Sequence, residues 1–137
     1  KNGNLLIGIS PGADGRIPDE QLVPLRGLGD WMRTNADAVV GTRPWLTATG
    51  WTSERTEVRF TRRDDLVYAL LLDVPGVRTF SLRDVDASSV DGVRLLGVDE
   101  PIDWSVDGAR LTVTLPERLP VSPVQALEIS GGLGRAG

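Results

Sequence analysis

Histidine and cysteine are both absent from this sequence of 137 residues, and each absence excludes a class of chemistry. Without histidine, the chain has no Ser-His-Asp triad and no Cys-His pair, and it lacks the commonest general base and metal ligand. Without cysteine, it has no disulfide, no thiolate nucleophile and no ordinary zinc site. The sequence therefore predicts no metal and no cofactor.

Lysine occurs only at position 1, and no apolar run approaches the roughly 20 residues of a membrane span. The 15 basic and 19 acidic residues give a net charge of -4, and the arginines are scattered along the chain. A mildly acidic chain without a basic patch argues against binding to nucleic acid or to an anionic membrane. We therefore expect no nucleic-acid partner and no membrane partner.

The first 40 residues have the pattern of a strand, a loop and a helix. Asn4 to Ile9 form an apolar run that is typical of a strand buried on both faces in a parallel sheet. A loop dense in glycine and proline follows it. Apolar residues at helical spacing then predict a helix up to Met32, with its regular part beginning near Pro24, because proline is tolerated in a first turn. A short helical turn is expected from Asn35 to Val40.

From Trp45 onward the pattern changes to short strands separated by turns. Alternation from Glu57 to Arg62 and the apolar run from Leu66 to Leu72 predict two strands joined by a hairpin at Arg63-Asp64-Asp65. A second hairpin turn is expected at Val106 to Ala109. Further strands are predicted at Thr79–Leu82, Val93–Leu96, Ile102–Trp104, Arg110–Leu115 and Val124–Ile129. Many short strands with regular turns indicate an antiparallel β-sandwich.

The predicted fold class is therefore mainly β: an antiparallel β-sandwich preceded by the last strand–loop–helix unit of a (β/α) barrel. We place the barrel unit at residues 1–43, the sandwich at residues 44–131 and a flexible tail at residues 132–137. A single unit of this kind cannot cover both faces of its own strand, so we expect it to belong to a larger parallel structure. The division also predicts that residues from Pro44 onward keep their β structure without the first 43.

Three polar motifs have some features of binding or catalytic sites. The glycine-rich loop from Gly8 to Gly15 lacks both the Gly-Lys-Ser/Thr of a Walker loop and the spacing of a dinucleotide fingerprint. Asp84, Asp86 and Ser88 alternate as in a calcium loop, but the glycine and glutamate that such a loop needs are missing. The adjacent Asp64 and Asp65 point to opposite sides of a strand and cannot flank one bond. The sequence thus predicts no catalytic residue.

Four tryptophans raise the question of sugar stacking, because exposed aromatic rings bind carbohydrate while most tryptophans are buried. Trp31 and Trp104 are expected to pack in a core. For Trp45 and Trp51, which lie at the junction of the two parts, packing between those parts is favoured over contact with a ligand.

Two stretches carry a resemblance to a known family. NGNLLIGISPGADGRIPDEQ and GDWMRTNADAVVGTRPW resemble the end of the catalytic barrel in family 29 glycoside hydrolases, the α-L-fucosidases. The strands that follow resemble the C-terminal β-sandwich of that family. The chain departs from the family's pattern where Gly8 replaces an asparagine, Ser10 replaces a glycine, and Asn35-Ala36-Asp37 replaces Asn-Gly-Glu.

The resemblance implies that the chain is the C-terminal fragment of a retaining hydrolase that removes terminal α-L-fucose from glycans with two carboxylates. In that family both carboxylates lie on earlier barrel segments, so the chain alone is expected to be inactive and structural. Its implied partners are the rest of the catalytic barrel and, for the parent enzyme, a fucosylated glycan. Gly8 and Ser10, at the mouth of the last strand, are the residues expected nearest to the substrate.

Two other interpretations stay open on the sequence. The sandwich could be a carbohydrate-binding module without catalysis, or an interaction domain of an unrelated multidomain protein. Upstream sequence with an Asp and a Glu at the ends of barrel strands would separate the first interpretation from these.

Overall fold

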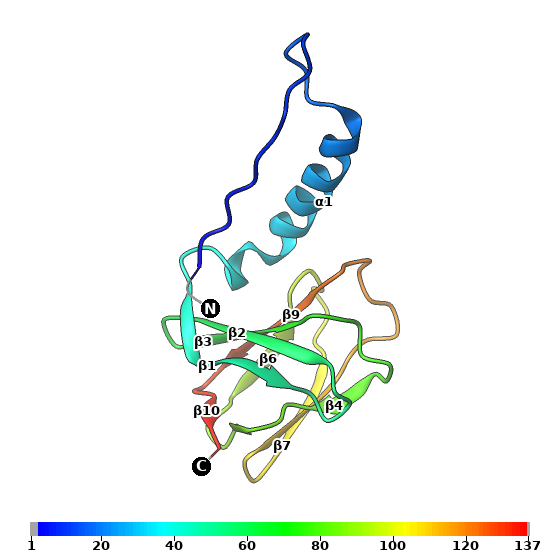
Figure 1. The fold of residues 1–137 in the computed structure, drawn as a ribbon. Helices are drawn as coiled ribbons and strands as arrows, with labels where there is room; N and C mark the ends of the chain where they lie inside the picture. The colour runs from blue at the N-terminus through cyan, green and yellow to red at the C-terminus, as the bar shows by residue number, and fades with distance from the viewer. Residues whose placement is uncertain (1–2, 137) are drawn as a thin grey trace.

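The computed structural model describes residues 3–136, and its main body is an antiparallel β-sandwich (Figure 1). A five-stranded sheet has the order β1-β2-β3-β9-β6, a three-stranded sheet has the order β4-β8-β7, and β10 pairs with β5. The strands are β1 (Arg43–Trp51), β2 (Glu57–Arg63), β3 (Leu66–Leu71), β4 (Thr79–Ser81), β5 (Val85–Asp86), β6 (Gly92–Leu95), β7 (Asp103–Asp107), β8 (Arg110–Thr114), β9 (Gln125–Ser130) and β10 (Gly134–Arg135). The predicted fold class, mainly β with antiparallel sheets, is confirmed.

Two predicted hairpins are present, and each turns at a residue with positive φ. Asp64 (φ 53°) lies between β2 and β3, and Gly108 (φ 59°) lies between β7 and β8. Aspartate and glycine are among the residues that adopt this left-handed conformation at low cost. In the first hairpin, Arg63 pairs with Leu66 and Val58 pairs with Leu71, which fixes the register of the two central strands.

The main hydrophobic core lies between the two sheets. Alternate residues of each strand point into it, so the period of two in the sequence becomes the inner face of the sandwich. The largest side chains that are almost fully buried there come from both sheets: Phe60, Leu71, Phe80, Leu95, Leu111, Leu115, Leu127 and Ile129. This core holds the sandwich together.

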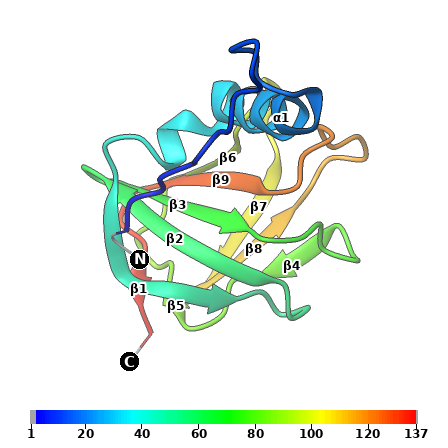
Figure 2. The ribbon, with the colours of Figure 1, turned by 45° about the horizontal axis from the view of Figure 1, so that its top comes forward.

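A second hydrophobic cluster lies on the other face of the five-stranded sheet, under the end of the helical segment (Figure 2). Tyr68 and Leu70 of β3 are buried there, whereas Val67, Ala69 and Leu71 of the same strand face the inner core. Strand β3 is therefore covered on both faces, as its continuous apolar sequence predicts. Trp31 and Ala38 of the helical segment cover this face, and the cluster also contains Leu66, Leu96, Val124 and Ala126.

The helical segment consists of α1 (Asp19–Asn35) and a 3₁₀ turn, η1 (Ala36–Ala38). Residues Asp19 to Val23, predicted as a separate first turn, belong to the regular helix, and Pro24 lies inside it. The reason is that the backbone N–H groups of Gln21 and Leu22 already donate to the carbonyl of Pro18. The first turn is thus helical, and Asp19 and Glu20 lie at its positive end. The short turn predicted at Asn35 to Val40 is confirmed by η1.

The first segment of the chain contains no strand, contrary to the expectation for Asn4 to Ile9. Residues 3–18 run beside α1 as an extended arm (Figure 1). Strand structure needs a neighbour that pairs with the backbone, and the described residues offer none to this arm. The side chains of Leu5 and Leu6 are 79% and 95% exposed, so the apolar surface that suggested a buried strand is uncovered.

The predicted flexible tail over residues 132–137 is wrong for residues 133–135. Leu133 is only 5% exposed in the inner core, and Gly134 and Arg135 pair with Asp86 and Val85 of β5. An apolar residue after two glycines with positive φ folds back onto the core instead of fraying. Residue 137 lies outside the described residues.

These contacts generate a prediction about truncated chains. A chain that starts at Pro44 keeps the inner core but loses Trp31 and Ala38, which uncovers Tyr68 and Leu70. We expect it to retain its β signal in circular dichroism and to melt at a temperature several degrees lower, since exposing large apolar side chains costs about 1.5–3 kcal/mol each.

A chain that starts at Asp19 is the control, because it loses only the exposed arm. It should melt at the temperature of the full chain. Equal melting temperatures for all three chains would contradict the second core, and loss of the β signal from Pro44 onward would contradict the division at residues 43 and 44.

Candidate functional site

Gly8 and Ser10, the residues predicted to lie nearest to a substrate, are on the exposed arm. The backbone N–H of Ser10 donates to Gln21 Oε1 at 2.9 Å, and Gln21 Nε2 donates to the carbonyl of Ser10 at 3.2 Å. This pair of hydrogen bonds attaches the arm to the first turn of α1. Nothing lies within 4 Å of the position that a Cβ would take at Gly8, so this glycine lies beside open space.

A hollow of about 330 Å³ separates the arm from the helix. Its lining is largely apolar, and Gly8 belongs to it, whereas Ser10 does not: Ile7, Gly8, Ile9, Glu20, Gln21, Pro24, Leu25 and Leu28. Glu20 is the single carboxylate among these residues. General acid–base cleavage of a glycoside needs two carboxyl groups on opposite sides of the bond. The structure therefore brings Gly8 into a hollow with one carboxylate, which is not sufficient for such a reaction.

The other carboxylates considered in the sequence analysis do not line this hollow. Asp64 and Asp65 are exposed in the β2–β3 turn, as predicted. Asp86 lies in β5 and accepts the backbone N–H of Ser88 at 3.0 Å, which lowers the pKa of its carboxyl group. Among residues 3–136, no group of three or more carboxylates is close enough to hold a metal ion. No helix in the same range is long and apolar enough to cross a membrane.

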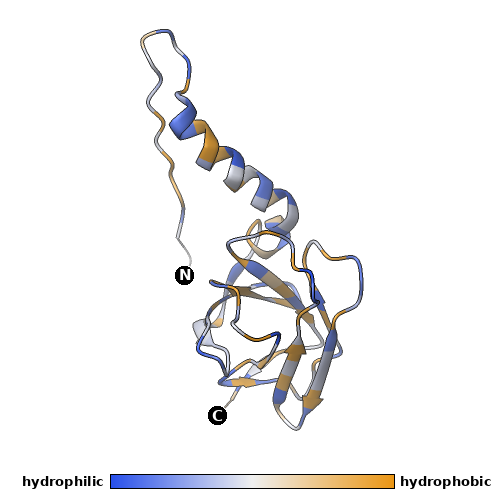
Figure 3. Cartoon of the chain, turned by 90° about the vertical axis from the view of Figure 1, so that its right-hand side faces the viewer, coloured by the Kyte–Doolittle hydropathy of each residue, from blue (hydrophilic) through white to orange (hydrophobic). Residues whose placement is uncertain are grey.

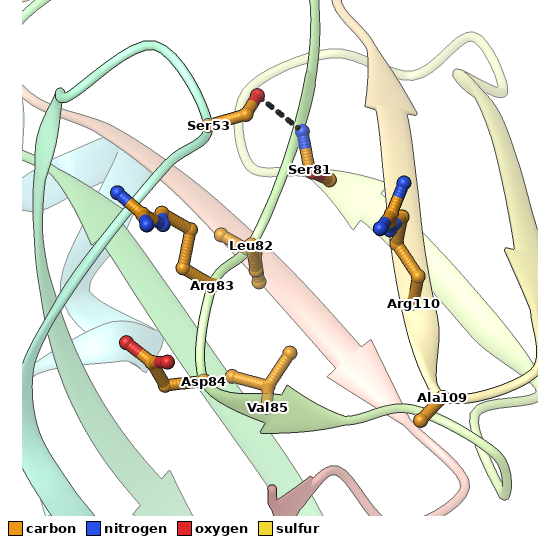
Figure 4. Close-up of a pocket in the computed structure, with 8 residues that line it drawn as sticks. All are labelled: Ser53, Ser81, Leu82, Arg83, Asp84, Val85, Ala109 and Arg110. Atoms are coloured by element: carbon orange, nitrogen blue, oxygen red, sulfur yellow. Dashed lines mark hydrogen bonds between the residues drawn. The ribbon is translucent and has the colours of Figure 1, made fainter.

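A hollow of about 540 Å³ opens on the sandwich beside β4, β5 and β8 (Figure 4). Arg83 and Asp84 lie on one side of it and Arg110 on the other. The Ser53 hydroxyl there already accepts the backbone N–H of Ser81 at 3.1 Å. The two guanidinium groups could attract an anion, but the carboxylate of Asp84 opposes this.

Several polar side chains from distant parts of the sequence meet at the junction of the helical segment and the sheet. Arg63 on β2 donates to Asp37 Oδ1 at 3.0 Å and to the hydroxyl of Tyr68 at 3.1 Å. The hydroxyl of Thr61 donates to the carbonyl of Ala38 at 2.7 Å. The indole N–H of Trp31 donates to the carbonyl of Val124 at 2.9 Å. These bonds attach the end of the helical segment to β2, β3 and the loop before β9.

Burial is the main cause that raises the pKa of Tyr68 above its ordinary value. The negative charge of Glu128 raises it further, while the cation of Arg63 opposes both effects. Glu128 itself is held by Arg94 through two bonds of 2.6 and 3.0 Å. The arrangement keeps Tyr68 neutral at physiological pH, so it serves packing and hydrogen bonding. The apolar run from Leu66 to Leu72 gave no sign that Arg63 would join the hydroxyl of Tyr68 to the carboxylate of Asp37.

The four tryptophans divide between the core and the surface. Trp45 is 6% exposed and packs in the inner core, with its ring 4.9 Å from that of Phe60. Trp31 and Trp104 are partly buried against the two clusters, which confirms their predicted packing. Trp51 is 45% exposed at the end of β1. The expectation that Trp45 and Trp51 pack between the two parts of the chain is therefore wrong for both.

The described residues thus form a β-sandwich with one outer face capped by the end of a helical segment. This is the architecture of an accessory domain joined to part of another structural unit.

Comparison with known proteins agrees with that class. Residues 52–130 match the family model described as the alpha-L-fucosidase C-terminal domain, and residues 1–37 match the model described as alpha-L-fucosidase. The chain belongs to the α-L-fucosidase family, and its sandwich is the C-terminal domain of that family.

Individual relatives show the same relation. The alpha-L-fucosidase of Branchiostoma floridae is 36% identical over 115 residues, which is 83% of this chain and 25% of the relative. The human tissue alpha-L-fucosidase is 31% identical over 125 residues, 90% of this chain and 26% of the relative. The structure of Thermotoga maritima alpha-fucosidase in complex with a mechanism-based inhibitor is also similar, with a TM-score of 0.82 and 34% sequence identity. The match covers 93% of this chain and 30% of the Thermotoga maritima chain. The chain spans about a quarter of the length of these curated relatives.

The junction generates a prediction about pH. Because the pKa of Tyr68 is raised in the folded state, the folded chain holds the proton more tightly than the unfolded chain does. Its contribution to stability is complete below the ordinary tyrosine pKa of about 10 and is lost as the pH rises above it. Tyr68 is the only tyrosine, so absorbance near 295 nm reports it alone. We expect a titration midpoint above 10 and a free energy of unfolding that falls over the same range.

Arg63→Ala should move the midpoint to higher pH, since it removes the nearby cation. Arg62→Ala is the matched control on the other face of β2, and it should leave the midpoint unchanged. A wild-type midpoint at or below 10 would contradict the burial of Tyr68.

Proposed function

We propose that the chain forms the C-terminal part of a retaining α-L-fucosidase, in which residues 1–43 are the last β/α unit of the catalytic barrel and residues 44–131 are a supporting sandwich. The observation that carries the proposal is the uncovered apolar arm. Leu5, Leu6, Ile7 and Ile9 are 79%, 95%, 45% and 46% exposed. Such a run of large apolar side chains is stable only when another surface covers it.

A barrel supplies the cover that this arm needs. The arm runs alongside α1 and is joined to it by a tight turn in which the N–H of Gly12 donates to the carbonyl of Arg16 at 2.8 Å (Figure 3). A neighbouring parallel strand would pair with its backbone, and barrel helices and interior side chains would cover its two faces. Each Leu or Ile that becomes fully buried would contribute about 1.5–3 kcal/mol.

The reaction follows from the family and not from this chain's own groups. Retaining glycosidases use a nucleophilic carboxylate and an acid/base carboxylate about 5–5.5 Å apart. We place both on barrel segments outside these residues, so that the parent enzyme removes terminal α-L-fucose from a glycan. Its relatives are named α-L-fucosidases, and the Thermotoga maritima alpha-fucosidase has a solved complex with fucose. Gly8 and Ser10 would then lie at the catalytic end of the last strand.

The sandwich supports the barrel through the junction described above. Trp31 and Ala38 belong to the helical unit but pack against the outer face of the five-stranded sheet, and the Trp31 indole also donates to the carbonyl of Val124. Asn35 is 3% exposed, and its side-chain amide donates to the carbonyl of Trp31 at 3.1 Å, which fixes the end of α1. This connection would hold the last barrel helix, and with it the closing strand, in a constant position. The role is structural.

The proposal predicts that the chain alone does not hydrolyse an aryl α-L-fucoside, whereas a chimera does. In the chimera, residues 1–137 replace the matching C-terminal part of the Thermotoga maritima enzyme, which shares 34% identity with them. We expect the isolated chain to release aryl alcohol no faster than buffer, and the chimera to show α-L-fucosidase activity.

A chimera carrying Leu6→Asp is the negative variant, because a charge at a buried barrel position should prevent assembly. The chimera carrying Leu46→Asp is its matched control, since Leu46 is 71% exposed on the sandwich. Enzyme-dependent turnover by the isolated chain would contradict the proposal, as would a folded chimera without activity.

A further inference from the structure

Trp51 is held outward by the residues on either side of it. Gly50 faces inward so closely that a Cβ there would lie 2.6 Å from Phe60 Cε2. Thr52 is fully buried and forms a bridge to Leu82. Because successive side chains of a strand alternate, the indole of Trp51 must point away from the core. Its backbone is also fixed, since the carbonyl of Trp51 accepts the N–H of Arg83 at 2.9 Å.

The exposed indole borders a hollow of about 410 Å³, the Trp51 hollow. Apolar side chains continue the surface, since Leu72 and Val74 are 38% and 48% exposed. Polar side chains surround them. The hollow is lined by Trp51, Glu54, Arg55, Thr56, Glu57, Leu72, Asp73, Val74 and Gly76. The hollow thus brings an indole and two aliphatic side chains together with several polar groups, a combination found in concave ligand sites.

The charges around the hollow indicate what it can bind. Glu57 is paired with Arg59 at 2.5 Å, and one oxygen of Asp73 accepts the backbone N–H of Val74 at 2.8 Å. Within residues 3–136, the side chains of Glu54 and Arg55 have no hydrogen bond or ion pair. Glu54 and the second oxygen of Asp73 are thus acceptors open to a ligand, and Arg55 is a donor. Two carboxylates beside one guanidinium disfavour an anionic ligand.

We propose that the Trp51 hollow binds a neutral sugar ring of a glycan. A sugar ring has an apolar face of C–H groups that packs against an indole, and hydroxyl groups at its edge that donate to carboxylates. The hollow offers both kinds of surface side by side. The choice of a fucose-bearing glycan rests on the proposed function, whereas the stacking chemistry does not. In the parent enzyme, such a site would hold sugar units beyond the fucose that is cleaved.

The test is a titration of the full chain with 2′-fucosyllactose and with lactose, followed through the tryptophan indole resonances in ¹H–¹⁵N NMR spectra. The resonance of Trp51 is identified by its loss in Trp51→Phe. We expect it to shift saturably, with a dissociation constant in the millimolar range that is typical of a few contacts. Saturation transfer to the sugar C–H protons should accompany the shift.

Variants separate this site from general adhesion of sugar. Trp51→Ala should weaken binding at least about tenfold, whereas Trp51→Phe should retain part of it because a flat ring remains. Glu54→Gln should weaken binding by a smaller factor. Leu46→Ala removes another exposed apolar side chain of β1, and it should leave binding unchanged. Circular dichroism shows that each variant is folded.

No saturable shift with either sugar would overturn the proposal, and so would binding that Trp51→Ala leaves intact. Binding of 2′-fucosyllactose alone assigns the contact to fucose, and binding of both sugars assigns it to the lactose core. The measurement uses the isolated chain and no hydrolysis. Its failure is therefore distinguishable from failure of the chimera to cleave an aryl fucoside.

Discussion

Burial of both faces of β3 is the constraint on which the rest of the structure depends. Val67, Ala69 and Leu71 need the three-stranded sheet on one side, while Tyr68 and Leu70 need α1 and η1 on the other. A buried tyrosine hydroxyl must also be hydrogen-bonded, and Arg63 satisfies it while reaching Asp37 of η1. Apolar contacts and hydrogen bonds to residues of β3 and its neighbour β2 therefore attach the helical unit to the sandwich.

The sequence predicted the parts of the fold that have a strict local pattern. The run from Leu66 to Leu72 and the hairpin turn at Val106 to Ala109 each depend on periodicity or on turn chemistry, and both are found in the structure. Strand β1 escaped a clear prediction because its register shifts between Pro44 and Thr49, which breaks the alternation of inward and outward residues. The pairing of β5 with β10 was not predicted, because each of these strands has only two residues and so shows no alternation of apolar and polar positions. The strand expected from Asn4 to Ile9 depended on neighbours that these residues do not include.

The candidate sites could be predicted only in part, for a similar reason. Sequence motifs were sufficient to relate the chain to the α-L-fucosidases and to mark Gly8 and Ser10, but not to show what lies around them. The exposure of Trp51 depends on two contacts far apart along the chain: that of Gly50 with Phe60, and the bridge from Thr52 to Leu82. Neither leaves a sign in local composition. The carboxylate of Asp73 reaches the same hollow because β3 runs antiparallel to β2.

The central claim is that the end of the helical unit and the sandwich form one cooperative structure, from which the arm is excluded. Native-state hydrogen exchange tests it most directly, by comparing the indole N–H of Trp31 with the backbone amides of β3 and of residues 4–9. The account predicts that the Trp31 indole, bonded to Val124, exchanges with a free energy of opening close to that of β3. The amides of residues 4–9 should exchange near the rate of an unfolded peptide. Fast exchange at Trp31 together with slow exchange in β3 would contradict the claim.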